Sequence, residues 1–157
     1  MESKLSLSEF RARLQNNTEI GSLKVNLSLF RLFPKFGGMK PFYGLFDDKS
    51  FRLTINSTTS PTYFIVKGSY KNVNNVLKIN YTVEPNSKAQ LIWVYYSPII
   101  LIVAINLFFL IFAKGLRRAS TIVNLFLLFM AFYSRWKEER KRKKLEQKFV
   151  RIFEIVK

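Results

Sequence analysis

Two long stretches without charged residues dominate the second half of the chain. The first runs for 25 residues, Ala89–Ala113, and its second half consists almost entirely of Ile, Leu, Phe and Val. A helix needs about 20 predominantly apolar residues to cross about 30 Å of hydrocarbon. The pattern predicts a transmembrane helix here, although residues 89–97 also fit a strand. A buried core helix is the alternative, and such helices seldom extend so far without a charge.

The second uncharged stretch, Ala119–Ser134, has 16 residues. As a helix it is about 24 Å long, which is short for a full span. It can cross if Arg118 and Arg135 extend toward the headgroups, or it can form a re-entrant or interfacial segment. Residues 114–118 contain Gly115 and form a short link, so the two helices should be antiparallel neighbours in a hairpin.

Aromatic residues mark one end of this predicted hairpin. They lie near the start of the first stretch and at the end of the second, so a hairpin brings them to the same face of the bilayer. Trp and Tyr are enriched at membrane–water interfaces. The predicted interfacial anchors are Trp93, Tyr95, Tyr96, Tyr133 and Trp136.

Asn106 and Asn124 are the polar residues deepest in the two stretches. A hydrogen bond between the two helices explains both residues, and such a bond stabilises a helix pair by about 0.6–2 kcal/mol. The alternative is a transport path, which usually contains ionisable residues. Neither stretch has any, so the interhelical contact is favoured.

A strongly basic segment follows the second stretch. Seven of the ten residues from 135 to 144 are Lys or Arg. The positive-inside rule places this segment in the cytoplasm. The charges of Lys114, Arg117 and Arg118 in the link favour the opposite orientation, but they are fewer. The sequence after Met1 does not read as a signal peptide, so both termini are expected in the cytoplasm at the inner membrane. The predicted contacts to anionic lipid headgroups are Arg135, Lys137, Arg140, Lys141, Arg142, Lys143 and Lys144.

The first 88 residues have the pattern of a small α+β domain. Ser6 and Glu9 have the spacing of a capping box, and Leu7, Phe10 and Leu14 share one helical face. This predicts a short amphipathic helix over residues 7–15. Residues 22–41 alternate like a strand at first and then resemble a loop.

Strand patterns follow and predict four antiparallel strands, or five: a short apolar run, an alternating segment, a β-branched and aromatic run, and a second alternating segment. The four are expected at Pro41–Phe46, Phe51–Asn56, Tyr63–Tyr70 and Val76–Glu84, with short turns between them. One face of such a sheet needs a cover, which the N-terminal helix supplies in part. A C-terminal helix can supply the rest through an apolar stripe of Leu145, Phe149, Ile152, Phe153 and Val156.

The expected fold class is therefore α+β: a small antiparallel sheet with N- and C-terminal helices, plus a two-helix transmembrane hairpin. The domains are a cytosolic α+β domain over 1–88, a hairpin over 89–134 and a basic amphipathic helix over 135–157. The hairpin is then an insertion between the last strand and a helix that returns to the sheet. Whether the second membrane helix runs on past residue 134 or bends there is left open.

The order of motifs carries a resemblance. After the capped helix come Phe42–Phe46, Phe51–Leu53, Phe64–Tyr70 and a strand closed by Pro85. This resembles a group of small bacterial membrane proteins with a cytosolic α+β module and a C-terminal transmembrane hairpin. That group usually has a basic segment before the third strand, where this chain has Asn56–Pro61 without basic residues. The resemblance implies no activity.

The composition limits which reactions and metal sites the side chains can support. The formal net charge is +16, and the chain has neither Cys nor His. Disulfides, thiolate chemistry, the commonest general base and the commonest metal ligand are excluded. Asp47–Asp48 could suggest a metal or acid–base site, but a hairpin turn explains the pair better. Gly37–Gly38 lacks the Lys-Ser/Thr pair of a phosphate-binding loop. No metal and no cofactor are expected.

Three functions fit these observations. The first is a membrane-anchored, non-enzymatic module whose cytosolic sheet binds a protein or small ligand. The second is a membrane-acting effector whose hairpins self-associate and disrupt the bilayer. An enzyme at the bilayer surface is the least favoured. The expected partners are the bilayer, its anionic headgroups, and a protein partner or further copies of the chain. Nucleic acid is disfavoured because the basic segment adjoins a membrane helix.

Overall fold

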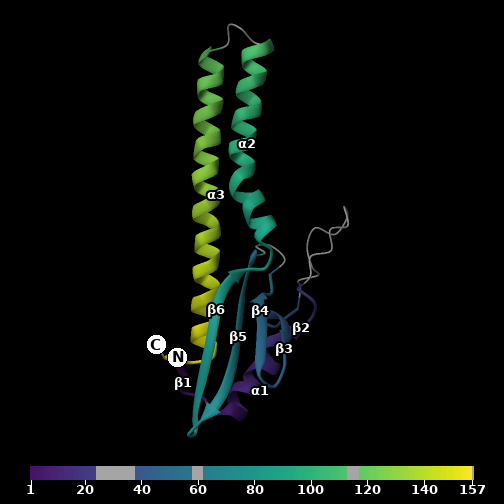
Figure 1. The fold of residues 1–157 in the computed structure, drawn as a ribbon, viewed down its shortest axis with the longest axis vertical. Coiled ribbons are helices and arrows are strands. Elements are labelled where there is room, and N and C mark those ends of the chain that lie inside the picture. Colours follow the sequence, from purple (N-terminus) through teal and green to yellow (C-terminus); the bar gives the residue numbers. More distant parts are fainter. Residues whose placement is uncertain (24–37, 58–61, 113–116, 157) are drawn as a thin grey trace. The chain divides into compact units, whose positions relative to one another are not determined.

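The computed structural model describes residues 1–23, 38–57, 62–112 and 117–156 (Figure 1). These residues form two compact units. The sheet unit comprises residues 1–86 and 141–157, and the helical unit comprises residues 87–140. The fold is mixed α+β, as the sequence predicts. Residues 24–37, which include most of the segment that alternates and then resembles a loop, lie outside the described residues.

The sheet unit contains a seven-stranded sheet in the described residues, in the order β2-β3-β4-β5-β6-β1-β7. Every pairing is antiparallel except the one between β2 and β3. The strands are β1 (Glu2–Ser3), β2 (Thr18–Ile20), β3 (Phe42–Phe46), β4 (Ser50–Ile55), β5 (Phe64–Val73), β6 (Val76–Pro85) and β7 (Ile155–Val156). The four predicted strands are confirmed as β3 to β6. The prediction of four or five strands is wrong in number, because three strands of two or three residues complete the sheet.

The hairpin of β5 and β6 turns at Asn74 and Asn75. Both residues have positive φ, 52° and 61°, as a two-residue type I′ turn requires. Asn tolerates this conformation better than most residues because its short side chain bonds locally. The turn sets the register of both strands, from Val73 opposite Val76 to Phe64 opposite Pro85.

Helix α1 (Leu7–Asn17) begins at the predicted capping box. The Ser6 hydroxyl accepts a bond from the Glu9 amide (3.3 Å), and the Ser6 amide donates to Glu9 Oε2 (2.9 Å). These reciprocal bonds satisfy amide donors that a helix start otherwise leaves open. The buried face of the helix consists of Phe10 and Leu14, which are fully inaccessible.

Helix α1 and the last turns of helix α3 (Arg117–Ile152) supply the core that covers one face of the sheet. Phe149 lies 5.1 Å from Phe51, and Phe153 lies 4.9 Å from Phe10, measured between ring centroids. Each of these rings is at most 1% exposed. Burial of a Phe side chain contributes about 1.5–3 kcal/mol, so the aromatic cluster joins the two ends of the chain to the strands between them.

Helix α3 answers one open question and corrects one expectation. It is continuous through residue 134 and runs on into the basic segment. It ends at Ile152, and Glu154 takes a positive φ of 46° that turns the chain into β7. Of the predicted stripe, Leu145, Phe149 and Phe153 are buried and Ile152 is half-buried. Val156 is 47% exposed because it lies in the edge strand.

The helical unit consists of α2 (Lys88–Phe112) and the first part of α3, which lie side by side and antiparallel (Figure 1). Residues 89–97 are helical, and Pro98 lies inside α2. Of the helices in the described ranges, only Lys88–Ile111 is long and apolar enough to cross a membrane. The expected second span over 119–134 does not qualify, because its apolar part is short and the helix continues into charged residues.

Candidate functional site

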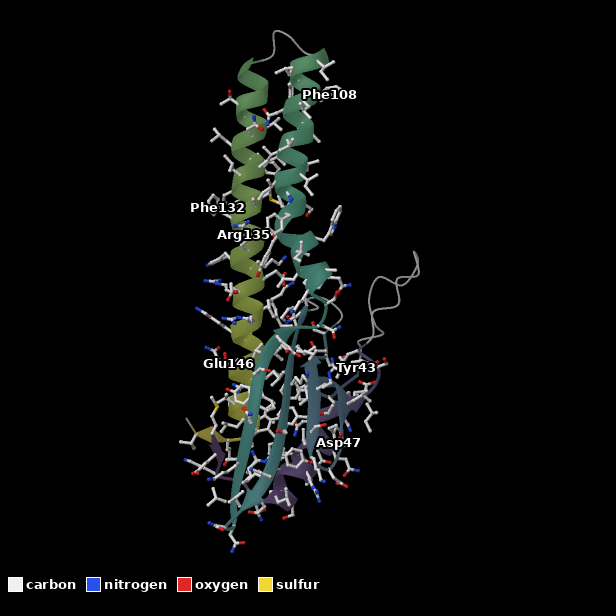
Figure 2. All side chains as sticks on the ribbon, viewed as in Figure 1. Tyr43, Asp47, Phe108, Phe132, Arg135 and Glu146 are labelled. Carbon is white, nitrogen blue, oxygen red and sulfur yellow. The ribbon has the colours of Figure 1, made fainter. Side chains whose placement is uncertain are left out.

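The surface of α2 is apolar over most of its circumference. Its candidate span has a mean hydropathy of 2.3, and none of that window is buried. Ile102, Ile105 and Phe109 form a half-buried stripe, while the large apolar side chains that are exposed include Ile100, Leu101, Val103, Leu107, Phe108, Leu110 and Ile111. Phe108 projects from the helix in Figure 2. A helix that is apolar on nearly all sides needs an apolar environment that the described residues do not supply.

The two predicted polar residues of the hairpin meet. Asn106 Nδ2 donates to Asn124 Oδ1, and Asn124 Nδ2 donates to Asn106 Oδ1, each at 2.8 Å. Asn106 Nδ2 also donates to the carbonyl of Ile102 (2.8 Å). One helical turn further, Leu127 is buried at 7% exposure. The reciprocal amide pair thus links α2 to α3.

The predicted interfacial residues lie at the end of the hairpin where α2 begins. The Arg135 guanidinium is 5.9 Å from the ring of Tyr95, which joins α3 to α2. On α3, the Arg140 guanidinium lies 3.6 Å from the ring of Trp136, and Lys137 lies 5.9 Å from that of Tyr133.

Trp93 and Tyr96 are 66% and 51% exposed, which leaves both rings available to the surroundings of α2. Aromatic rings and cations therefore gather at one end of the helical unit, the combination that membrane interfaces favour.

The remaining predicted lipid contacts belong to the sheet unit. Lys141 lies 5.9 Å from the ring of Tyr63. Lys143 and Lys144 are exposed, and Arg142 is half-buried. The structure therefore divides the seven basic residues between the two units rather than placing them on one helix face of one unit.

Asp47 and Asp48 form a turn, as the sequence favours. Asp47 Oδ1 accepts bonds from the amides of Lys49 (2.8 Å) and Ser50 (2.7 Å), and these bonds with the Ser50 hydroxyl lower the pKa of Asp47. Asp48 lies 3.3 Å from Arg11. Nowhere in the described ranges do three His, Cys, Asp or Glu residues group as metal ligands would. Of the Gly37–Gly38 pair, Gly37 lies outside those ranges.

The sequence did not predict a basic groove that the structure forms in the sheet unit. The groove has a volume of about 590 Å³ and lies between the start of α1, the β3–β4 turn and the end of the β5–β6 hairpin. Arg11, Lys49, Lys71 and Lys78 line it, against one acidic residue, Asp48.

Neutral residues complete the groove. Leu7, Tyr70 and Ile79 contribute apolar wall, and Tyr70 donates from its hydroxyl to the Asp47 carbonyl (2.7 Å). Burial raises the pKa of Tyr70, so its hydroxyl stays protonated. Ser69 and Asn80 also line a second hollow of about 360 Å³ that lies over β4 to β6. Arg52 and Lys67 line this second hollow.

Searches with the sequence and the structure find no matching family model, curated protein or solved structure. The resemblance to small bacterial membrane proteins therefore stays a prediction.

Proposed function

We propose that this chain is a membrane-anchored, non-enzymatic binding module. The helical unit lies in the inner membrane, and the sheet unit and both chain ends lie in the cytoplasm. One observation carries the proposal: α2 is a helix of spanning length whose apolar window has no buried residue. Neither water nor the rest of the described chain provides a favourable environment for that surface.

The energetics favour insertion of α2. Residues 99–111 contain eleven Leu, Ile, Val or Phe. At about 0.3–0.6 kcal/mol each near the bilayer centre, they contribute about 3–7 kcal/mol to insertion. The apolar part of α3 is shorter. It completes a transmembrane hairpin if Arg135 extends to the headgroups and the bilayer thins locally, which costs fractions of a kcal/mol per Å.

The orientation follows from the charges around the hairpin. Residues 135–144 carry seven basic residues and two acidic ones, and basic segments stay on the cytoplasmic side. Each Lys or Arg near an anionic surface contributes about 1 kcal/mol. Trp136 and Tyr95, with the cations beside their rings, hold this end of the hairpin at the interface.

A binding role for the sheet unit rests on composition and shape. The absence of His and Cys removes the side chains that most often act as bases and nucleophiles near neutral pH. The unit nevertheless presents a concave basic surface beside the turn at Asp47–Ser50. A charged groove without a catalytic constellation is typical of recognition rather than turnover.

Membrane extraction tests the anchor. The full chain should stay with membranes after alkaline carbonate washing and should float with liposomes of neutral lipid. The double variant Val103→Arg/Leu107→Arg, at two exposed positions of α2, should lose most of this association, since each Arg costs about 2.5–3.5 kcal/mol in mid-membrane. Leu45→Arg, at an exposed position of the sheet unit, is the control. A wild-type chain that stays monodisperse without detergent contradicts the proposal.

The second candidate is an effector that disrupts the bilayer through self-associated hairpins. It is favoured by the short apolar part of α3, because a short hydrophobic segment thins the surrounding bilayer or drives helices to associate. Dye release from liposomes at low protein-to-lipid ratio separates the two candidates: an effector releases the dye, and a binding module leaves the vesicles sealed.

A further inference from the structure

We propose that the basic groove of the sheet unit binds a soluble oligophosphate, such as a nucleoside polyphosphate or an inorganic polyphosphate. This inference deepens the proposed function, on which it rests for the role of the sheet unit as a binding module. The groove volume of about 590 Å³ lies within the range of small-ligand sites, about 300–1,000 Å³.

The first argument is the origin of the cations. They come from separate parts of the chain: Arg11 from α1, Lys49 from the β3–β4 turn, and Lys71 and Lys78 from the two strands of a hairpin. Lys71 and Lys78 alternate with the buried Tyr70 and Ile79, and Tyr70 packs on Phe10 of α1, so these lysines line the hollow from the other side of the hairpin. The neutral donors Ser69, Asn72 and Asn80 lie in the same lining.

The second argument is like-charge pairing across strands. Lys71 lies directly opposite Lys78, and Arg52 lies directly opposite Lys67. Like charges in this arrangement destabilise a sheet. Lys67 has one acidic neighbour, Glu84, at 3.6 Å.

Within the larger groove the charge balance stays positive. Glu2 lies directly opposite Lys78 on β1 and offsets part of this repulsion, but it does not line the groove. Lys71 and Lys78 therefore keep an unfavourable interaction that a bound polyanion relieves.

The third argument concerns the nearby carboxylates. Asp47 does not compete for the cations because its oxygens accept three bonds within its own turn. Asp48 pairs with Arg11 at 3.3 Å, but its side chain is 86% exposed. Such an exposed ion pair is weak, so a multiply charged ligand can displace the Asp48 carboxylate and bind the guanidinium, which also donates to the Asp48 carbonyl (3.0 Å).

The shape favours a small phosphate ligand over nucleic acid or a membrane. Single-stranded nucleic acid is bound through exposed aromatic rings on which bases stack. The aromatic residue of the larger groove, Tyr70, is only 4% exposed. A flat bilayer cannot enter a hollow between a helix start and a strand hairpin. The fork of Arg11 and the point charges of the lysines suit phosphate oxygens.

Calorimetric titration of the full chain in neutral-lipid nanodiscs tests this inference with inorganic tripolyphosphate and ATP as probes. Lys71→Gln/Lys78→Gln removes two groove cations. Lys4→Gln/Arg151→Gln removes two exposed cations outside both hollows, so both variants lower the net charge equally from +16. We expect the groove variant to bind tripolyphosphate about tenfold or more weakly, and the control within about twofold of wild type.

Three results would overturn the inference. They are no binding by the wild-type chain, equal weakening in both variants, and loss of tripolyphosphate binding when the nanodiscs contain anionic lipid, which would identify a headgroup as the occupant. Flotation of each variant with neutral liposomes is measured in parallel. A chain that floats but binds no phosphate refutes only the proposed phosphate binding in the groove. A chain that fails to float refutes the proposed membrane anchor.

Discussion

Replacement of Phe149 by Ala is the sharpest test of how the fold closes. Phe149 is fully buried in the last turns of α3. Its ring centroid lies 5.1 Å from those of Phe51 and Tyr81 and 4.9 Å from that of Phe153. Because residue 149 and the strands come from opposite sides of the helical unit in the sequence, this ring joins segments that local structure alone would not hold together.

The expected loss is large relative to the stability of a small domain. Truncation of a buried Phe to Ala costs about 3–5 kcal/mol, from the lost transfer free energy and the cavity that remains. Loss of the ring pairs with Phe51 and Tyr81 places Phe149 in the upper part of that range. Since domains are stable by about 5–15 kcal/mol, the variant should lose a third or more of its free energy of unfolding.

The assay must report on the sheet unit alone. Both Trp residues, Trp93 and Trp136, lie in the helical unit, so Trp fluorescence would miss the change. Hydrogen exchange in detergent micelles, read on peptides from Phe64–Pro85, measures the opening of β5 and β6 directly. Gln147→Ala, an exposed position on the same helix, is the control and should change stability by no more than about 0.5 kcal/mol. If the amides of these strands are equally protected from exchange in Phe149→Ala and in Gln147→Ala, α3 does not close the sheet.

Three further predictions test local features. Ser6→Ala should cost about 1 kcal/mol in a melt of the sheet unit. The Ser6 amide, which the variant keeps, and the Ser6 hydroxyl both lower the pKa of Glu9, so only the part of the cost that comes from the hydroxyl–carboxylate bond should be full above the unfolded-state pKa of Glu9 and be lost as pH falls through its folded-state pKa. Asp47→Ala should lower the melting temperature more than Asp47→Asn, which keeps one acceptor oxygen for the turn; equal effects would mean that the turn does not depend on these bonds. Asn106→Leu and Asn124→Leu should show a coupling of about 0.6–1.7 kcal/mol in a double-mutant cycle in detergent, and additive effects would argue against the amide pair.

The elements with local signals were predictable. The capping box of Ser6 and Glu9 placed the start of α1. Alternation placed β4 and β6, and short runs of apolar, β-branched and aromatic residues placed β3 and β5, because those patterns depend only on neighbouring residues. The strands β1, β2 and β7 were not predictable. Two or three residues cannot establish a period of two, so these strands exist only through pairing with residues far away in the chain, such as Glu2 with Lys78.

The end of α3 shows a second limit of prediction from the sequence. The spacing of Leu145, Phe149 and Phe153 gave the buried face correctly, but Val156 continued the same helical stripe and was assigned to it. The helix stops because Glu154 adopts a positive φ, which a non-Gly residue rarely does without tertiary support. Arg13 supplies that support, since it donates to Glu154 Oε1 (2.7 Å) and to the Ile152 carbonyl (2.8 Å). No property of residues 150–156 alone reveals this contact.

The candidate sites show the same contrast between local patterns and contacts of distant segments. The basic segment after residue 134 was visible as a run in the sequence, whereas Arg11 and Lys49 of the groove come from segments that only the fold brings together. Lys71 and Lys78 were within reach of sequence reasoning. They stand three residues before and three residues after the Asn74–Asn75 turn, and a two-residue turn at that point sets them opposite each other.

The two groups of cations differ in how their backbone positions are arranged, and we expect this difference to separate their ligands. Strand register holds Lys71 and Lys78 at directly opposing positions, so both side chains extend from the same face of the hairpin. Two cations on one face can contact one compact anion. Lys137, Lys143 and Lys144 are exposed along a helix, where successive residues point in different directions. We therefore expect each of these cations to contact a separate headgroup of an extended anionic surface rather than one small molecule.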